Sequence, residues 1–430
     1  MFDAVVIGSG LSGLTAALYL QQYGMQTLVL ERRTVPGGLC GTFTLDGYEF
    51  VIGCNDFGSG MMRTLQGLGV DVEFLTPKAR FQLGDHVINL PPDLPTIGKL
   101  VRRIPGMATV LWQARRNPQQ TIGQLVDEHL RDPLLADAAC LPVTGMMRSV
   151  DDVTVGEIGE NFSKEHDYGY EKSCTPVGGP GSMVDGMVSR FEQLGGELRL
   201  GCEFLAVDRQ GDNKRVLTSA GPVLARTVLS SEGRWKHYPP GTKPGIEVAV
   251  LLLAVDKSFP YPRGYHTLAW FTPGVADQLR RLDAGLPVPK PSFHIFRSDL
   301  PEQPRHYTIN AYMPLPRGER TPSLQRRTSL SEHVIETIEA SLPGFRRALI
   351  YQRFLSPADY ESQLGLRCAP SPYVPPKGFQ KLPSYDAELD MHFLGTSVGP
   401  PGEHAGAASR SGKLGAEQAI QRLTNQIQAN

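Results

Sequence analysis

A glycine-rich segment near the start of the chain has the spacing of a phosphate-binding turn. Residues 8–13 read G-x-G-x-x-G, directly after the apolar run Ala4–Ile7 and before a helical pattern over Leu14–Tyr23. In this context the first glycine allows a tight bend, the second lets the backbone approach a pyrophosphate, and the third lets helix and strand pack closely. Amides at the start of the helix then face the phosphate charge. The predicted contacts are Gly8, Gly10, Leu11, Ser12 and Gly13.

An acidic residue stands where the ribose of the same nucleotide is expected. Glu31 follows the second apolar run, Thr27–Leu30. A carboxylate about twenty positions after the turn accepts hydrogen bonds from ribose hydroxyls in dinucleotide-binding domains. Arg32 follows it and is predicted to lie beside the nucleotide. A glycine turn without a ligand is the alternative interpretation, and Glu31 argues against it. The turn and Glu31 fit NAD as well as FAD.

Further glycine-bearing segments favour FAD. Pro36–Gly41 with Leu45–Gly53, and 393–412 near the C-terminus, resemble signatures of the flavin-containing amine oxidase and phytoene desaturase superfamily. The resemblance places the first segments along the diphosphate and ribityl chain, and the last at a helix start that faces the flavin ring. A helix N-terminus stabilises the negative charge of a reduced flavin. The resemblance implies non-covalent FAD contacts at Gly38, Leu39, Cys40, Gly53, Phe204, Gly395, Thr396, Gly402, Ala405, Gly406 and Ala407.

The phytoene desaturase branch is the closer resemblance, because it also covers 341–344 and 356–360 and so spans nearly the whole chain. It implies an oxidoreductase in which a hydride passes from a substrate C–H bond to flavin N5 and loss of a neighbouring proton leaves a double bond. Carbon–nitrogen oxidation, as in amine oxidases, is one alternative, and isomerisation is another. A binding protein of the prenyl-protein escort kind, without redox chemistry, is a third. Because no second G-x-G-x-x-G motif occurs, electrons are expected to come from the substrate.

Two polar residues, Glu403 and His404, lie where the resemblance expects small or apolar residues next to the flavin. Either one is a candidate to accept the substrate proton or to bind a polar group of the substrate. The alternative is that they only support the start of the last helix, where a negative charge is electrostatically favourable.

The composition is that of an ordinary globular protein, and it excludes several classes of function. The formal net charge of −1 offers no basic excess for a nucleic-acid partner. Six cysteines without a C-x-x-C pair indicate neither a metal site nor a dithiol motif, and they suit a reducing cytoplasm. A small-molecule substrate of largely apolar character is expected, because few polar residues converge outside the cofactor motifs. The sequence leaves the oligomeric state open.

The order of patterns along the chain predicts an α/β protein of two interleaved domains. A Rossmann-type FAD-binding domain of the glutathione-reductase kind is expected from 1–75, 176–240 and 386–430. An α+β substrate domain is expected from 76–175, where the period is mainly helical, and from 241–385, where strands dominate the first half.

One surface segment mixes basic and apolar residues. Residues 99–116 could rest on an anionic membrane and admit a lipophilic substrate, which would add peripheral membrane contact to the cytoplasmic location. A solvated helix that covers the substrate pocket is the other interpretation. Pro105 and Gly106 favour this second interpretation, because they are expected to interrupt an amphipathic face.

Overall fold

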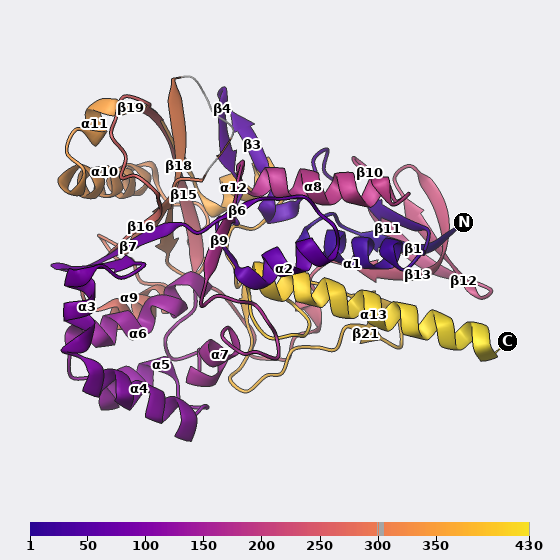
Figure 1. The fold of residues 1–430 in the computed structure, drawn as a ribbon, viewed down its shortest axis with the longest axis horizontal. Helices are drawn as coiled ribbons and strands as arrows, with labels where there is room; N and C mark the ends of the chain where they lie inside the picture. The colour runs from indigo at the N-terminus through magenta and orange to yellow at the C-terminus, as the bar shows by residue number, and fades with distance from the viewer. Residues whose placement is uncertain (299, 301–304, 430) are drawn as a thin grey trace.

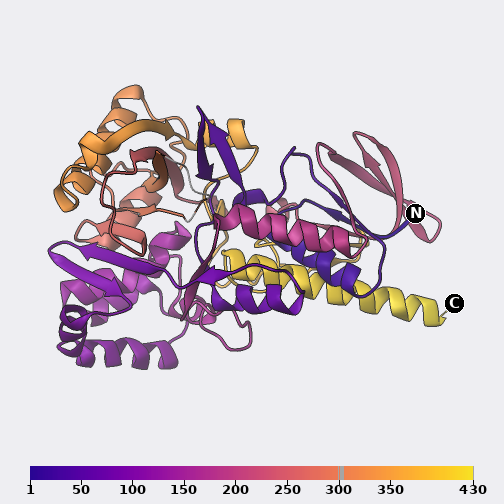
Figure 2. The ribbon, with the colours of Figure 1, turned by 45° about the horizontal axis from the view of Figure 1, so that its top comes forward.

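Two β-sheets, each built from separate segments of the chain, lie at opposite ends of an elongated molecule (Figure 1). The computed structural model describes residues 1–298, 300 and 305–429. Both termini lie at the end formed by the first sheet (Figure 2). The α-helices are α1 Leu11–Gln22, α2 Ser59–Gly67, α3 Leu94–Val101, α4 Ile104–Arg116, α5 Ile122–His129, α6 Pro133–Met146, α7 Val155–Glu160, α8 Gly179–Gln193, α9 Val275–Asp283, α10 Leu324–Ser341, α11 Phe345–Ala348, α12 Pro357–Leu364 and α13 Ala405–Ala429.

The first sheet carries the cofactor motifs. Its strands are β1 Phe2–Ile7, β2 Thr27–Leu30, β10 Glu197–Arg199, β11 Phe204–Gln210, β12 Asn213–Thr218, β13 Gly221–Ser230, β21 Tyr385–Asp386 and β22 Met391–Phe393. They run in the order β10-β2-β1-β13-β12-β11, with β22 parallel to the end of β13. Val5 of β1 lies between Leu28 and Val228, and all three are fully buried, as in the centre of a parallel sheet. The carboxyl ends of β1, β2, β13 and β22 meet at one edge, where ligands bind in such sheets.

Helices α1, α8 and α13 pack with this sheet around a common apolar cluster. The cluster includes Leu14 and Leu18 of α1, Met187 of α8 and Ala416 of α13. Helix α13 approaches α1 so closely that a Cβ on Gly412 would lie 2.2 Å from the Ser12 carbonyl oxygen. The last helix of the chain is thereby fixed against the first.

The central strands of the second sheet are buried on both faces. Its strands are β7 Lys78–Leu83, β8 His86–Leu90, β15 Glu247–Asp256, β16 Tyr265–Phe271, β17 Phe293–Phe296, β18 His306–Leu315 and β19 Leu349–Leu355, in the order β19-β15-β18-β17-β16-β7-β8. Alternate residues of β15 enter different apolar clusters, one shared with α10 and the other with α5, α6 and α9. This explains the continuous apolar run in β15.

Strand β18 of the second sheet is joined to the small hairpin of β3 Thr42–Leu45 and β4 Tyr48–Val51. The Asn310 side-chain amide donates to the Val51 carbonyl at 2.7 Å, and the Thr308 hydroxyl donates to the Glu49 carbonyl at the same distance. The remaining short elements are β5 Phe57–Gly58, β6 Phe74–Leu75, β9 Ser173–Pro176, β14 Lys243–Pro244, β20 Tyr373–Val374 and the 3-10 turns Gly38–Cys40 and Trp235–His237. The second sheet is therefore anchored directly beside the segment that leads to Gly53.

The structure corrects two local predictions. The region after residue 76 is not uniformly helical, because β7 and β8 form a hairpin that joins the second sheet. Pro105 and Gly106 do not interrupt a helix, because they lie in the first turn of α4, where proline is tolerated. The break falls between α3 and α4, at Arg102 and Arg103. Within the described residues, no helix is long and apolar enough to cross a membrane.

Candidate active site

The turn between β1 and α1 has the geometry that its glycines predicted. Gly8 has φ +90°, and a Cβ on it would lie 2.1 Å from the Ser231 hydroxyl oxygen. A Cβ on Gly13 would lie 1.9 Å from the Gly8 carbonyl oxygen, so the helix can pack this closely only without a side chain there. A Cβ on Gly10, by contrast, would meet no atom within 4 Å. Protein atoms therefore leave no space for a side chain at Gly8 and Gly13, whereas the space beside Gly10 is empty of protein atoms.

The open space at Gly10 suits an anion. Gly10 is the N-cap of α1, and no side chain caps the amides of the first turn, which include those of Leu11 and Ser12. A helix start without a side-chain cap presents N–H donors and partial positive charge. On the other side, a Cβ on Gly38 would lie 3.2 Å from the Gly10 Cα, so Gly38 bounds the same space. These donors and this shape fit a pyrophosphate.

Glu31 lies beside the turn, at the end of β2, and is 7% exposed. The Ser9 amide and hydroxyl donate to its Oε2 at 2.9 and 2.8 Å, and the Arg33 amide donates to its Oε1 at 2.9 Å. These bonds orient the carboxylate toward the turn. The Arg32 guanidinium is directed elsewhere, since it donates to the Gly365 carbonyl beyond α12.

The segment that contains the double glycine folds back over the turn. Gly37 and Gly38 have φ +100° and +55°, and the Gly37 amide donates to the Ser9 carbonyl at 2.9 Å. The Leu39 carbonyl accepts from the amides of Gly53 and Cys54 at 3.0 and 2.9 Å, which brings Gly53 next to Leu39. Cys40 is buried in the cluster around α1. The residues predicted for the diphosphate and the ribityl chain therefore form one continuous surface.

Phe204 begins β11, close to the Glu31 end of β2. The Cys202 amide donates to the Glu31 carbonyl at 2.9 Å, two residues before Phe204. Phe204 is half-buried and packs against the apolar cluster of the first sheet. This position suits the predicted contact with the adenine end of the cofactor.

The C-terminal motif reaches the same edge of the sheet. The Gly395 amide donates to the Ser411 hydroxyl at 3.1 Å, and Thr15 of α1 pairs with Ser409 of α13 at 3.2 Å. The Lys381 ammonium donates to the carbonyls of Thr396 and Gly402, both at 2.6 Å, and so closes the loop between them. The start of α13, at Ala405, Gly406 and Ala407, therefore lies near the start of α1.

His404 is the N-cap of α13. Its Nδ1 accepts from the Ala407 amide at 3.2 Å, so its Nε2 carries the proton and donates to the Asn161 side-chain oxygen at 2.8 Å. The rings of Tyr168 and Tyr170 lie edge-on to it at 4.6 and 4.7 Å. Burial lowers the pKa of His404 to about 3, so the ring is neutral near pH 7.

Glu403 belongs to a cluster of polar side chains next to this cap. The Ser371 hydroxyl donates to its carboxylate, and Lys381 and Arg148 are the nearest positive charges. Burial raises the pKa of Glu403 above its ordinary value, although the two cations oppose that shift. Burial also lowers the pKa of Lys381 to about 8, against the attraction of Glu403. Burial thus shifts the two pKa values in opposite directions, because it disfavours the charged form of both groups.

Lys381, Ser371 and Asn161 were not identified from the sequence. Each lies in a region without a recognisable motif, and each reaches the site across at least 15 positions of the chain. No local signal marks such residues. The structure alone brings them together.

An apolar pocket lies behind the face of the second sheet that approaches Gly53. The Asn55 side-chain amide donates to the Gly53 carbonyl at 3.2 Å and to the Tyr312 hydroxyl at 3.1 Å. The Tyr312 ring stacks on His294 with centroids 5.6 Å apart, and His294 lines a hollow of about 350 Å³ with its open mouth, together with Met147, Phe271, Val275, Leu279, Leu282 and Phe293. Contacts through Asn55, Tyr312 and His294 thus connect the segment at Gly53 with this hollow.

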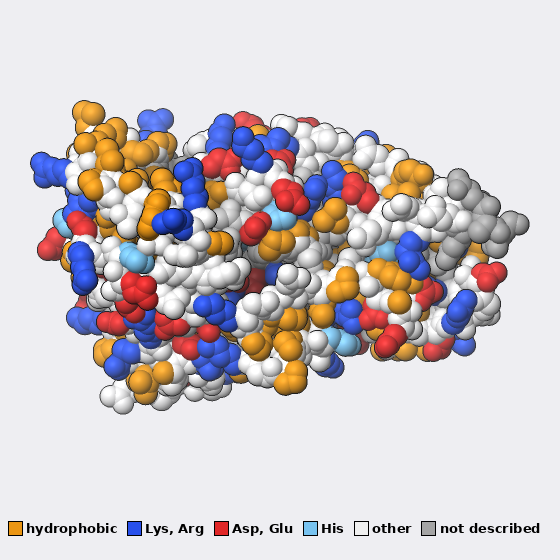
Figure 3. All heavy atoms as spheres, turned by 90° about the horizontal axis from the view of Figure 1, so that it is seen from below, with side chains coloured by type: hydrophobic (Ala, Val, Ile, Leu, Met, Phe, Trp, Pro, Cys, Tyr) orange, Lys and Arg blue, Asp and Glu red, His pale blue; other side chains and the backbone are white. Residues whose placement is uncertain are grey.

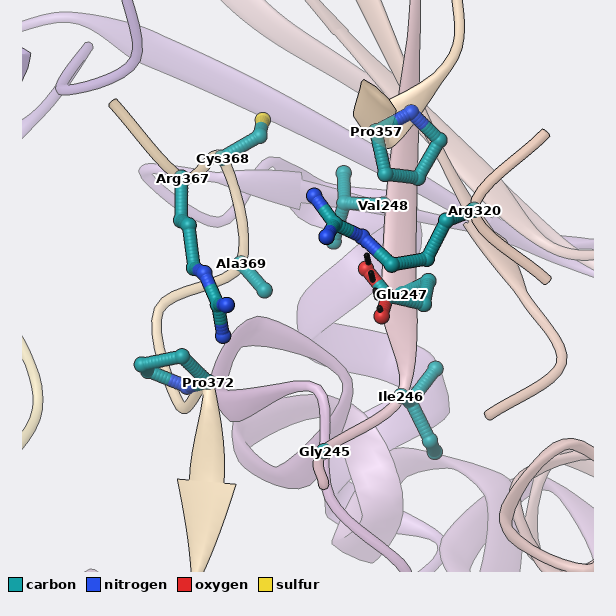
Figure 4. Close-up of a pocket in the computed structure, with 10 residues that line it drawn as sticks. All are labelled: Gly245, Ile246, Glu247, Val248, Arg320, Pro357, Arg367, Cys368, Ala369 and Pro372. Carbon is teal, nitrogen blue, oxygen red and sulfur yellow. Dashed lines mark ion pairs between the residues drawn. The ribbon is translucent and has the colours of Figure 1, made fainter. Parts of the chain in front are cut away.

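A second hollow, of about 330 Å³ with its open mouth, is lined by charged residues (Figure 4). Arg367 lies on one side and the Glu247–Arg320 pair, at 3.9 Å, on the other. Cys368 also lines it, and burial raises the pKa of the Cys368 thiol to about 12. A thiol that stays protonated at neutral pH is a poor nucleophile.

Comparisons with known proteins place this geometry in a class. Residues 6–63 match the family model of the NAD(P)-binding Rossmann-like domain. An oxidoreductase from Methanosarcina mazei has a similar fold, with a TM-score of 0.66 and 15% identity over 97% of this chain and 99% of that one. Putrescine oxidase bound to putrescine gives a TM-score of 0.68 and 16% identity over 98% and 99% of the two chains. The chain thus contains a Rossmann-like dinucleotide-binding segment and shares its overall fold with these two proteins, which confirms the predicted fold class.

Curated relatives match short parts of this chain. An inactive all-trans-retinol 13,14-reductase of Danio rerio is 42% identical over 87 residues, which are 20% of this chain and 14% of that protein. Prolycopene isomerase 2 of an Oncidium hybrid cultivar is 50% identical over 52 residues, 12% of this chain and 9% of that protein. The chain thus matches only a small part of the length of either relative, and over those short segments the phytoene desaturase-like resemblance agrees with them.

Proposed function

We propose that this protein is an oxidoreductase that binds one FAD without a covalent bond. The observation that carries the proposal is the open, uncapped α1 start at Gly10, which Gly38 and Glu31 border on two sides. The turn would hold the pyrophosphate, Glu31 the ribose, and the segment from Gly38 to Gly53 the ribityl chain. The start of α13 would face the flavin ring. The protonated Cys368 thiol supports non-covalent binding.

FAD, when bound, supplies a hydride acceptor, and a desaturation also requires a group that takes up a proton. We propose Glu403 for that proton rather than His404. Both ring nitrogens of His404 already make hydrogen bonds, and its pKa of about 3 leaves it unable to hold a proton near pH 7. The Glu403 carboxylate has a raised pKa and lies beside Lys381, a second group able to exchange protons. His404 would instead position the start of α13.

An apolar substrate is proposed, bound between the second sheet and the flavin. The pocket behind Tyr312 supports this, because mainly apolar side chains line it. The names of two relatives that match short segments of this chain refer to prolycopene and all-trans-retinol, which are apolar isoprenoids. Oxidation of an amine is the second candidate, and the fold-wide likeness to putrescine oxidase favours it.

All six cysteines are free thiols, which supports a cytoplasmic location.

Anaerobic reduction of the bound flavin tests the proposed reaction. Candidate isoprenoids and amines are mixed with the purified protein without oxygen, flavin bleaching is followed, and products are analysed by mass. We expect an apolar isoprenoid to bleach the flavin and to lose two hydrogens. Bleaching by an amine with loss of two hydrogens would select the second candidate. A protein that binds isoprenoids but holds no flavin would support an escort-like binding function instead.

Two substitutions distinguish the roles of Glu403 and His404 in the same assay. Glu403→Gln is expected to slow flavin reduction by about 10²- to 10⁴-fold, the range for loss of a general base. His404→Asn keeps a side chain able to cap α13 and is expected to retain most of the rate. Equal rates in wild type and Glu403→Gln would remove Glu403 from the proposed chemistry.

A further inference from the structure

Helices α3 and α4 expose an unusual number of large apolar side chains. Of the 20 large hydrophobic residues that are exposed in the described part of the chain, seven lie between 94 and 112. Trp112 is 53% exposed and Leu111 is 62% exposed. The seven residues are Leu94, Ile97, Val101, Ile104, Met107, Leu111 and Trp112. Figure 1 shows that α3 and α4 lie at the end of the molecule far from the termini, and in Figure 3 apolar, basic and acidic side chains are intermixed at that end.

The exposed residues follow the helical repeat. Positions 94, 97 and 101 in α3, and 104, 107 and 111 in α4, are spaced i, i+3 and i+7, so each helix presents one apolar stripe outward. A surface helix of a globular protein normally turns such a stripe toward the core. Here the stripe has no partner in the described structure. We call this surface, residues 94–112 with the basic residues up to 116, the α3–α4 face.

Contacts on the side of α4 that faces the rest of the protein prevent the helix from rotating about its axis. Its apolar stripe therefore cannot turn toward the core. The Arg103 guanidinium pairs with Asp132, the N-cap of α6, at 3.0 Å. Gln113 is 4% exposed, and a Cβ on Gly106 would lie 2.3 Å from a Leu135 methyl carbon. The apolar stripe is therefore held outward by the fold.

The charge of this face has one sign. Residues 94–116 contain Lys99, Arg102, Arg103, Arg115 and Arg116 and no acidic residue, in a chain whose formal net charge is −1. Within the described structure, Arg102, Arg115 and Arg116 make no ion pair, and the Arg116 guanidinium lies 4.8 Å from the centre of the Trp112 ring. Free arginines beside exposed aliphatic residues and a tryptophan match the chemistry of the boundary between anionic headgroups and acyl chains.

We propose that the α3–α4 face binds peripherally to an anionic lipid bilayer, with its apolar stripe at the level of the acyl boundary and its arginines among the headgroups. A second copy of the chain is a poorer occupant, because a symmetric contact would bring two sets of arginines together without acidic partners. Binding to lipid does not depend on the cofactor, so the proposal goes beyond the proposed oxidoreductase activity and can fail independently of it.

Flotation of the full-length protein with vesicles tests the proposal. Vesicles of phosphatidylcholine alone are compared with vesicles that also contain phosphatidylglycerol, at low and high salt. We expect the protein to float with the anionic vesicles, and added salt to weaken that binding. Trp112→Glu with Leu111→Glu is expected to lower the bound fraction by about tenfold or more, because apolar burial is lost. Neutralising Arg102 or Arg115 to Gln should lower it about fivefold each.

Matched controls lie elsewhere on the surface. Leu324→Glu changes a 79% exposed leucine on α10, and Arg215→Gln neutralises an exposed arginine on β12; neither should alter flotation. Wild type that stays unbound with anionic vesicles, or α4 variants that float as wild type does, would overturn the proposal. If the protein self-associates without vesicles, and the α4 variants abolish that association, the α3–α4 face would instead bind a second copy of the chain.

Discussion

Gly10→Ala is expected to leave the fold intact and to weaken FAD binding by about 5- to 150-fold. Gly10 has φ −67° and ψ 175°, which alanine adopts without strain, and the added Cβ would meet no protein atom within 4 Å. The proposed pyrophosphate occupies that space, so the methyl group would contact the ligand at a cost of roughly 1–3 kcal/mol. Titration of the cofactor-free protein with FAD, together with the thermal unfolding midpoint, measures both effects.

Two other glycines serve as controls for this prediction. Gly67→Ala also meets no atom within 4 Å, at the end of α2 and away from the proposed site, and should change neither property. Gly13→Ala should lower stability itself, since its Cβ would lie 1.9 Å from the Gly8 carbonyl oxygen. FAD affinity unchanged in Gly10→Ala would mean that the pyrophosphate does not approach this turn.

His404→Asn is expected to make the protein less sensitive to acid. The pKa of His404 in the folded protein is about 3, below the ordinary 6.5 of an unfolded chain. The unfolded chain therefore binds the extra proton first as the pH falls. The contribution of the neutral ring to stability is complete above about pH 6.5 and is lost progressively toward pH 3. About 2.5 kcal/mol of it is lost between pH 7 and pH 4.5.

Asparagine can replace the cap without titrating. At pH 7 the variant should be somewhat less stable, because the smaller side chain leaves space between Tyr168 and Tyr170. Relative to wild type, the variant should gain about 2.5 kcal/mol of stability near pH 4.5, so the deficit should shrink or reverse. Denaturant unfolding at both pH values measures this difference, with His86→Asn as the control at an exposed histidine. A parallel pH dependence of wild type and His404→Asn would show that His404 is not held neutral.

The sequence was most informative where a local pattern imposes one geometry. The turn at Gly8 to Gly13 was predictable because its tight bend and close helix packing require glycine. Glu31 was predictable because its distance from the turn along the chain follows from the lengths of the helix and strand between them. The buried strand β15, Glu247–Asp256, was predictable as one of the strands expected after residue 241, because its apolar run is continuous.

Features that depend on contacts between distant segments were not predictable. The role of Lys381 arises because a loop residue meets two carbonyls from 396 and 402, and nothing near it in the sequence marks that contact. His404 as a helix cap was foreseen only as an alternative, because its partner Asn161 lies 243 positions away. The hairpin β7–β8 was missed because its strands are only half-buried and lack a clear alternation.

The proposed function requires that the glycine turn, Glu31 and the start of α13 together hold FAD. The most direct test is to release the cofactor from the purified protein with acid and to identify it by mass and absorbance. We expect FAD in about a one-to-one ratio with the chain, recovered in the supernatant rather than bound to the precipitate. A colourless protein that takes up no FAD, or one that yields only NAD, would contradict it.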